Sequence, residues 1–139
     1  ITDRIKKVHD FLTVGAAAPL MEAAVTGLLE NDEYYANLQK HYTHKKELFC
    51  TGLKNLGFSF TEPQGAYYVL MDVSEFKVSD DYEFCEWMAK EVGVAAVPGS
   101  SFFKEDIHNL VRFHFAKNDE TLNEALNRLA NLRQKARSR

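Results

Sequence analysis

The hydrophobic spacing of this chain changes at Gly57, and that change limits the folds open to it. Before Gly57, apolar residues over 32–56 recur at three- and four-residue steps, which predicts a helix of about 24 residues. Gly57 itself suits the left-handed residue that commonly ends a helix. Beyond it, short apolar segments at 58–60 and 66–71 flank a turn rich in proline and glycine, a pattern typical of paired strands.

The rest of the chain mixes helical and strand patterns in the same way. The further elements predicted by spacing, caps and breakers are an amphipathic lead-in over 1–18, a helix from Pro19 to about Glu30, a helix over 79–92 capped by Ser79 and ended by Gly93, strands at 94–97 and 110–115, and a closing helix that begins at Asn118 or Asp119. This order predicts a small, mostly antiparallel sheet of about four strands with helices on one face, an α/β (α+β) two-layer sandwich.

The strand expected at 110–115 has two chemically different faces. Val111, Phe113 and Phe115 point one way and should meet the helices, whereas Arg112 points the other way. The strand expected at 66–71 is apolar on both faces, and such a strand is usually covered on both sides. We therefore expect part of its cover to come from outside this chain.

Composition favours an ordinary folded domain and argues against some partners. Of the 139 residues, 45% are hydrophobic and 27% are charged, a balance typical of globular proteins. The net charge of -3 opposes a nucleic-acid or anionic-membrane surface, so we expect no nucleic acid and no membrane among the partners. The longest apolar stretch is too short to cross a bilayer, and the N-terminal residues do not resemble a signal peptide.

Two further features bear on where the chain comes from. Cys50 and Cys85 lie within helical patterns among apolar neighbours, which predicts buried free thiols and a reducing, cytoplasmic setting. The chain begins with Ile1 rather than methionine, so we expect it to have been cut from something longer.

No complete catalytic set is present in the sequence. The spacings of His41 with His44, and of His108 with His114, do not match a metal motif, so no metal site is predicted. The Gly-Ser-Ser run at 99–101 fails the nucleophile-elbow pattern, because position 103 is phenylalanine rather than glycine. Catalytic residues are therefore not assigned.

Arg112 is the candidate with the clearest chemistry. A planar guanidinium presents a fork of donors that matches a carboxylate. The turn at Pro98-Gly99 precedes the arginine and could line a pocket beside it. The alternative interpretation is an arginine on the exposed face of a strand.

Five segments, in this order and spacing, together resemble the C-terminal (small) domain of class I/II aminotransferases, which are fold-type-I enzymes dependent on pyridoxal 5′-phosphate. The resemblance covers essentially the whole chain. The segments are Ala18-Pro19-Leu-Met-Glu-Ala23, Gly57-Phe with Pro63-Gln-Gly65-Ala-Tyr-Tyr68, Val97-Pro-Gly-Ser-Ser-Phe102, Leu110-Val-Arg112-Phe-His-Phe-Ala116, and the closing Glu120-Thr-Leu with Ala125-Leu.

The resemblance implies a role for several residues. In that family the arginine matching Arg112 binds the substrate α-carboxylate. The neighbouring segments border the substrate side of the cleft, which implies lower-ranked lining roles for the residues Gly65, Tyr67, Pro98 and Gly99.

The resemblance also implies a domain division and a partner. Residues 1–30 would be a lead-in and interdomain helix from the large-domain side, and residues 31–139 would be the small domain. The loop matching Thr13–Ala18 lies near the dimer interface in relatives, so a homodimer is expected for the parent protein, with the missing large domain as a further partner.

The cofactor residues of the family have no match here. Its members hold pyridoxal 5′-phosphate as a Schiff base on a lysine of the large domain. None of the chain's lysines has that context, so no cofactor is expected in this chain, and the isolated chain is expected to be inactive. Phe103 and Lys104 also stand where many relatives carry a small residue. The parent would transfer an amino group between an amino acid and a 2-oxo acid.

Two other classes of function remain open at this point. The chain could be a free-standing module that binds amino acids, or a dimerisation module without catalysis. An RNA-binding sheet is disfavoured, because the basic-aromatic strand motif that such sheets carry is absent.

Overall fold

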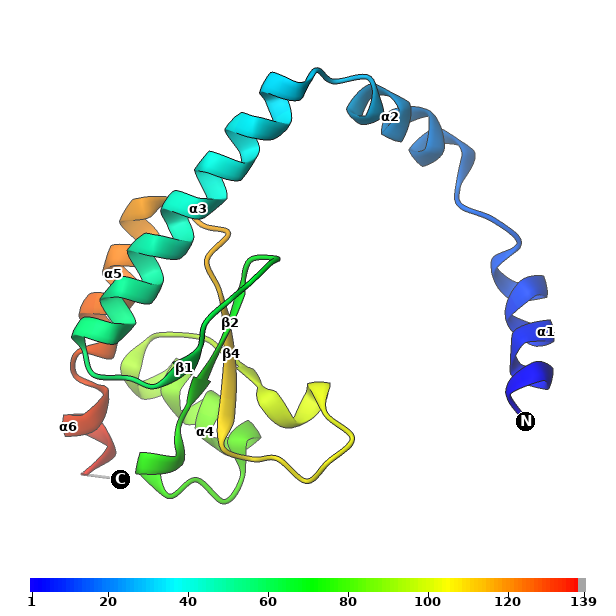
Figure 1. Ribbon diagram of the computed structural model, residues 1–139. Helices are drawn as coiled ribbons and strands as arrows, with labels where there is room; N and C mark the ends of the chain where they lie inside the picture. The colour runs from blue at the N-terminus through cyan, green and yellow to red at the C-terminus, as the bar shows by residue number, and fades with distance from the viewer. Residues whose placement is uncertain (138–139) are drawn as a thin grey trace. The chain divides into compact units, whose positions relative to one another are not determined.

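The computed structural model describes residues 1–137 and divides the chain into two compact units (Figure 1). The first unit is Ile1–Leu38, and the second begins at Gln39 and holds the remainder. The division falls within α3, the long helix Asp32–Asn55.

The first unit contains two further helices with few buried side chains. These helices are α1, Thr2–Thr13, and α2, Ala18–Leu28. Pro19 lies in the first turn of α2, as the sequence predicts, because a missing N–H is harmless there. α2 buries none of its residues, although its sequence is apolar, and Leu20 and Leu28 are both largely exposed.

The predicted long helix is confirmed, together with its end signal. α3 runs over 24 residues and buries Phe49 and Leu53 in the second unit. Gly57 has a φ of 75°, and the amide of Phe58 donates to the carbonyl of Leu53 at 3.0 Å. A left-handed glycine followed by this bond is the usual way to satisfy the last carbonyls of a helix.

The second unit contains the predicted four-stranded antiparallel sheet, in the order β1-β2-β4-β3. The strands are β1, Phe60–Thr61; β2, Tyr68–Asp72; β3, Val97–Pro98; and β4, Leu110–His114. β2 and β4 lie side by side at its centre (Figure 1).

Three strands begin later than the sequence predicts, and β4 ends at His114, one residue earlier than expected. The strand expected at 58–60 begins only at Phe60, because Phe58 completes the end of α3. The strand expected at 66–71 begins at Tyr68, because Ala66 has a φ of 56° and belongs to the turn. The strand expected at 94–97 pairs only from Val97 onward.

The two faces of the sheet differ as the alternation predicts. On the inner face, side chains of the two central strands are buried against residues of α3, α4 (Asp81–Trp87) and α5 (Asp119–Leu129). The inner set is Val69, Met71, Val111 and Phe113, each at most 5% exposed. The opposite face carries the half-buried residues Tyr68, Leu70 and Arg112.

The helix expected at 79–92 is present but differs at both ends. Its cap is Asp80 rather than Ser79, since the Asp80 carboxylate accepts the amides of Tyr82 and Glu83. Its last turn, η2 at Met88–Val92, has π-helical geometry before the left-handed Gly93.

The closing helix is capped by Asn118, as expected, and α5 lies beside α3 (Figure 1). Nε2 of His44 on α3 pairs with a carboxylate oxygen of Asp119 on α5 at 2.6 Å. The helical pattern resumes after a break as α6, Leu132–Ala136.

Both cysteines are buried and free, as predicted. Burial, the largest cause, raises the pKa of the Cys50 thiol to about 11 and that of Cys85 to about 12. Such thiols behave as small apolar side chains rather than nucleophiles.

Candidate carboxylate-binding site

Arg112 lies at the middle of the sheet's open face. It is the central residue of β4, opposite Leu70 of β2 on one side and Val97 of β3 on the other. Directly opposed residues of antiparallel strands point to the same face, so these three side chains share one surface. The alternation that buries Val111 and Phe113 therefore directs Arg112 away from the core.

Two aromatic rings hold the guanidinium. Its central carbon lies 3.6 Å from the ring centroid of Phe102 and 4.2 Å from that of Tyr68. A cation over an aromatic face is attracted by the ring quadrupole, and arginine adds stacking to this attraction. Both rings thus lie against the guanidinium, and its N–H groups have no carboxylate partner among residues 1–137.

The arginine opens into a pocket of about 450 Å³. The residues that line this pocket are Thr61, Glu62, Pro63, Gln64, Tyr68, Leu70, Phe102 and Arg112. Within residues 1–137, Arg112 has no carboxylate partner, and Glu62 instead pairs with Lys46 at 3.1 Å. An unpaired guanidinium in a partly apolar pocket is suited to bind a carboxylate from a small molecule.

The turn that carries Phe102 is hydrogen-bonded to the start of α4. This turn is η3, Gly99–Phe102, and the carboxylate of Asp81 accepts both the amide and the hydroxyl of Ser100, at 2.8 and 2.9 Å. Desolvation acts to raise the pKa of Asp81, but the hydrogen bonds from Ser100 and His108 together hold it below its usual range.

Gly99 packs against the neighbouring strand. A Cβ added there would lie 2.6 Å from the carbonyl oxygen of Leu110, so a larger residue would displace the backbone. The close packing of glycine at this position keeps the turn against β4.

The other residues named from sequence do not line the pocket beside Arg112. Pro98 pairs with Val111 in the sheet, and Gly99 is buried. Gly65 is exposed in the turn before β2. The ring of Tyr67 packs on that of Tyr68, with 4.5 Å between centroids.

Sequence reasoning missed the two rings that hold Arg112. Tyr68 shares the alternation of Leu70, so the register of β2 with β4 would have indicated it. Phe102 follows the Pro-Gly turn, and the sequence indicates only that it belongs to that segment. Its position depends on the turn's contacts, which have no local sequence signal.

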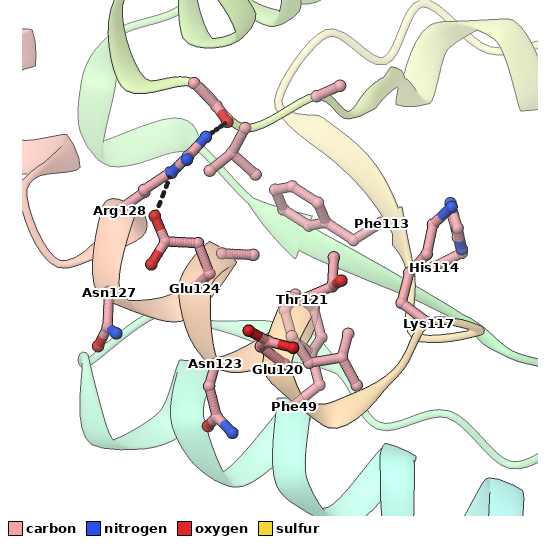
Figure 2. A pocket seen from close by; sticks show the side chains of 15 residues that line it. Phe49, Phe113, His114, Lys117, Glu120, Thr121, Asn123, Glu124, Asn127 and Arg128 are labelled. Carbon is pink, nitrogen blue, oxygen red and sulfur yellow. Dashed lines mark hydrogen bonds and ion pairs between the residues drawn. The ribbon is translucent and has the colours of Figure 1, made fainter.

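A second, larger hollow of about 1010 Å³ lies over α5 (Figure 2). Its arginine, Arg128, is already engaged: Nε contacts Glu124 at 2.7 Å, and Nη1 donates to the carbonyl of Gly93 at 2.9 Å (Figure 2). The pair with Glu124 lies within α5, and the bond to Gly93 holds α5 to the segment before β3. The guanidinium here is a structural tie, unlike that of Arg112.

Metal and membrane chemistry find no support in the described part of the chain. No group of three or more His, Cys, Asp or Glu side chains among residues 1–137 could hold a metal ion. None of the helices described combines the length and apolar character that a membrane span requires.

The open face of the sheet thus carries an arginine without a carboxylate partner among residues 1–137, and comparison with known proteins gives the family of the chain. The family model for aminotransferase class I and II matches residues 1–129. The chain therefore belongs to the class I and II aminotransferases, a family dependent on pyridoxal 5′-phosphate.

Individual relatives support the assignment. The methionine aminotransferase of Escherichia coli is 35% identical over 133 residues, which are 95% of this chain and 34% of that protein. The structure of N-succinyldiaminopimelate aminotransferase from Mycobacterium tuberculosis matches with a TM-score of 0.76 and 33% identity, over 88% of this chain and 33% of that one. The structure of an aromatic aminotransferase from Pyrococcus horikoshii matches with a TM-score of 0.77 and 26% identity, over 97% and 36%. The chain spans about a third of the length of these relatives.

The pocket beside Arg112 does not by itself fit the family's cofactor. A Schiff base with pyridoxal 5′-phosphate needs a lysine amine, and no lysine lines this pocket. Lys45, the buried lysine of α3, instead donates to the carbonyl of Lys117. The pocket beside Arg112 therefore offers no amine for the cofactor.

Proposed function

We propose that the whole protein carrying this chain is an aminotransferase, in which Arg112 binds the α-carboxylate of an amino acid or 2-oxo acid. The single observation that carries this proposal is the guanidinium held between two rings over a pocket, without an acidic partner among residues 1–137. A guanidinium in that state has its electrostatic and hydrogen-bonding capacity available for a ligand.

The two rings also restrict the direction from which a ligand can approach the charged guanidinium. Because Tyr68 and Phe102 both lie against the guanidinium carbon, we expect a carboxylate to reach the guanidinium along its N–H edge. An in-plane approach allows two parallel hydrogen bonds and fixes the orientation of the substrate. Leu70 and Phe102 contribute apolar walls that exclude water from this ion pair and strengthen it.

The cofactor half of the reaction is assigned to residues outside this chain. Pyridoxal 5′-phosphate, when bound, supplies the carbonyl that exchanges with the amino group. We propose that a large domain carries it, and that this domain covers the open face, where Tyr68 and Leu70 are only half buried. We also propose that the parent protein works as a homodimer.

The test compares arginine variants in the full-length protein. Arg112→Lys keeps the charge but loses the fork, so kcat/KM for amino donors should fall about tenfold, the value of one hydrogen bond to a charged group. Arg112→Ala should lower it by about a hundredfold or more, because the carboxylate is left unpaired. The matched control is Arg128→Lys, whose guanidinium is engaged with Glu124 and Gly93.

The outcome separates the proposal from its rivals. Equal kcat/KM in Arg112→Ala and the unmodified protein would remove the arginine from substrate binding. The 139-residue chain alone is expected to transfer no amino group and to yield no lysine adduct after borohydride reduction with the cofactor. Binding of amino acids by the chain alone, lost in Arg112→Ala, would instead favour a binding module without catalysis.

A further inference from the structure

We propose that Asp81 is a positioning residue for Arg112: it fixes the 99–102 turn and thereby seats Phe102 on the guanidinium. This inference rests on the proposed function of Arg112 as the carboxylate ligand. Asp81 itself lies at the start of α4, is 1% exposed and does not line the pocket. It acts through the turn and has no contact with the substrate pocket.

Asp81 holds the turn through two hydrogen bonds to Ser100. One carboxylate oxygen accepts the Ser100 amide at 2.8 Å, and the other accepts the Ser100 hydroxyl at 2.9 Å. Bonds to a buried carboxylate are among the stronger hydrogen bonds in proteins. Together they fix both the backbone and the side chain of the same residue.

The path from Ser100 to Phe102 is short. Both residues belong to η3, a single 3-10 turn, whose backbone is also closed by the Phe103 amide and the Ser100 carbonyl at 3.5 Å. Gly99 presses the start of this turn against Leu110. The turn is therefore held on one side by the sheet and on the other by Asp81, and the ring of Phe102 is directed onto Arg112 at 3.6 Å.

Burying a carboxylate is costly, and an apolar residue of similar size often stabilises a fold at least as well. The two shortest bonds of this buried carboxylate go to Ser100, and His108 Nδ1 is a longer contact at 3.3 Å, so its burial is better explained by the geometry that it imposes. Here that geometry is the conformation of the turn beside the arginine.

The test uses two variants that weaken the grip and two that should not. Asp81→Asn replaces one acceptor by a donor facing Ser100, and Ser100→Ala removes only the hydroxyl bond. Ser100→Thr keeps the hydroxyl, so it should behave like the unmodified protein. Asp80→Asn removes the same charge from the same helix end but keeps the cap, and its carboxylate does not contact Ser100.

The first readout needs only the 139-residue chain. The guanidinium carbon of Arg112, to which Nε is bonded, lies over two aromatic rings, and ring currents shift nearby protons such as Nε–H upfield. In proton–nitrogen spectra, Asp81→Asn and Ser100→Ala should move this resonance toward the position of an unstacked arginine. Asp80→Asn and Ser100→Thr should leave it in place. Thermal unfolding of each variant shows that the fold persists, and Ser100→Ala carries the test if Asp81→Asn does not fold.

The second readout uses the full-length enzyme and isolates positioning from general damage. Asp81→Asn should raise KM for the amino donor by about tenfold, the equivalent of one hydrogen bond to a charged group, with kcat much less affected. An unchanged Arg112 resonance together with an unchanged KM would overturn the role of Asp81, even if Arg112→Ala abolishes binding. If the Arg112 resonance moves in Asp81→Asn but Arg112→Ala leaves KM unchanged, the proposed function of Arg112 is wrong. The link from Asp81 through the turn to Arg112 would then still hold.

Discussion

Phe102 lies closer to the guanidinium of Arg112 than Tyr68 does, at 3.6 Å against 4.2 Å. The closer ring comes from a turn, whereas Tyr68 comes from a central strand of the sheet. The arginine is thus held by one ring fixed through strand pairing and by another fixed through the contacts of a short turn. The turn is the more easily altered of the two supports.

Replacement of the closer ring should weaken carboxylate binding modestly. In the full-length protein, Phe102→Leu should raise KM for the amino donor about two- to fivefold, the value of a partly exposed cation–π contact. Phe103→Leu is the matched control, because its ring is the neighbouring aromatic and is not stacked on Arg112. Steady-state kinetics measure both, and a similar rise in the two variants would contradict a specific role for Phe102.

Packing at Gly99 should be intolerant of a methyl group. The added Cβ of Gly99→Ala would lie 2.6 Å from the Leu110 carbonyl oxygen, so the turn or strand must shift, at a cost of about 1–3 kcal/mol of unfolding free energy. Gly65→Ala meets nothing within 4 Å and should change stability by less than about 0.5 kcal/mol. Urea unfolding of the two variants checks the difference, and equal stabilities would refute the close packing.

The pKa of His108 should be higher than that of an ordinary histidine. Its Nε2 faces Asp106 at 2.8 Å and its Nδ1 faces Asp81 at 3.3 Å. The hydrogen bond to Asp106 is the largest cause that raises the pKa of His108, followed by the hydrogen bond to Asp81. Proton NMR titration should therefore give a pKa above about 6.5, and Asp106→Asn should lower it. A His108 pKa that Asp106→Asn leaves unchanged would contradict this cause.

The same network sets the direction of a pH effect on stability. Protonated His108 is favoured in the folded state, so its contribution is complete below about pH 6.5 and is lost as pH rises through the raised pKa. The lowered pKa of Asp81 acts oppositely: its contribution is complete above the ordinary carboxyl range and is lost as pH falls through the folded pKa. Unfolding curves across pH should show the His108 part disappear in His108→Gln.

Arg133 should matter more for stability than its exposure suggests. Its guanidinium forms two bonds with Glu75, at 2.7 and 2.8 Å, and donates to the carbonyls of Leu56 and Gly57 at the end of α3. Arg133→Ala should reduce the unfolding free energy by about 1–2 kcal/mol, a value kept low by solvent screening of the ion pair. Arg137→Ala removes the same charge from the same region and should cost less. Urea unfolding compares them, and equal losses would mean that only net charge is involved.

Local signals explain which parts of the fold could be predicted from the sequence. The long helix is defined by its own spacing and by Gly57, whose left-handed conformation ends it. The outward face of Arg112 follows from alternation within a single strand. The cap at Asn118 likewise depends on one local hydrogen bond, in which the Asn118 side chain accepts from the amide of Thr121.

Non-local contacts explain what could not be predicted. β3 is only Val97–Pro98, because its extent depends on which backbone groups meet β4. The pairing of Arg112 with Tyr68 depends on strand register, and its pairing with Phe102 depends on a turn held by Asp81 from a different helix. No spacing in the sequence records these distances across the fold.

The alternation along β4 separates two roles of the strand. Val111 and Phe113 are buried in the core, whereas Arg112, between them, is half-buried on the opposite face of the sheet. Substitution of the half-buried Leu70 or Arg112 should therefore cost the fold less than substitution of the buried Val111 or Phe113. A single strand thus carries the packing of the core on one face and the chemistry of the open surface on the other.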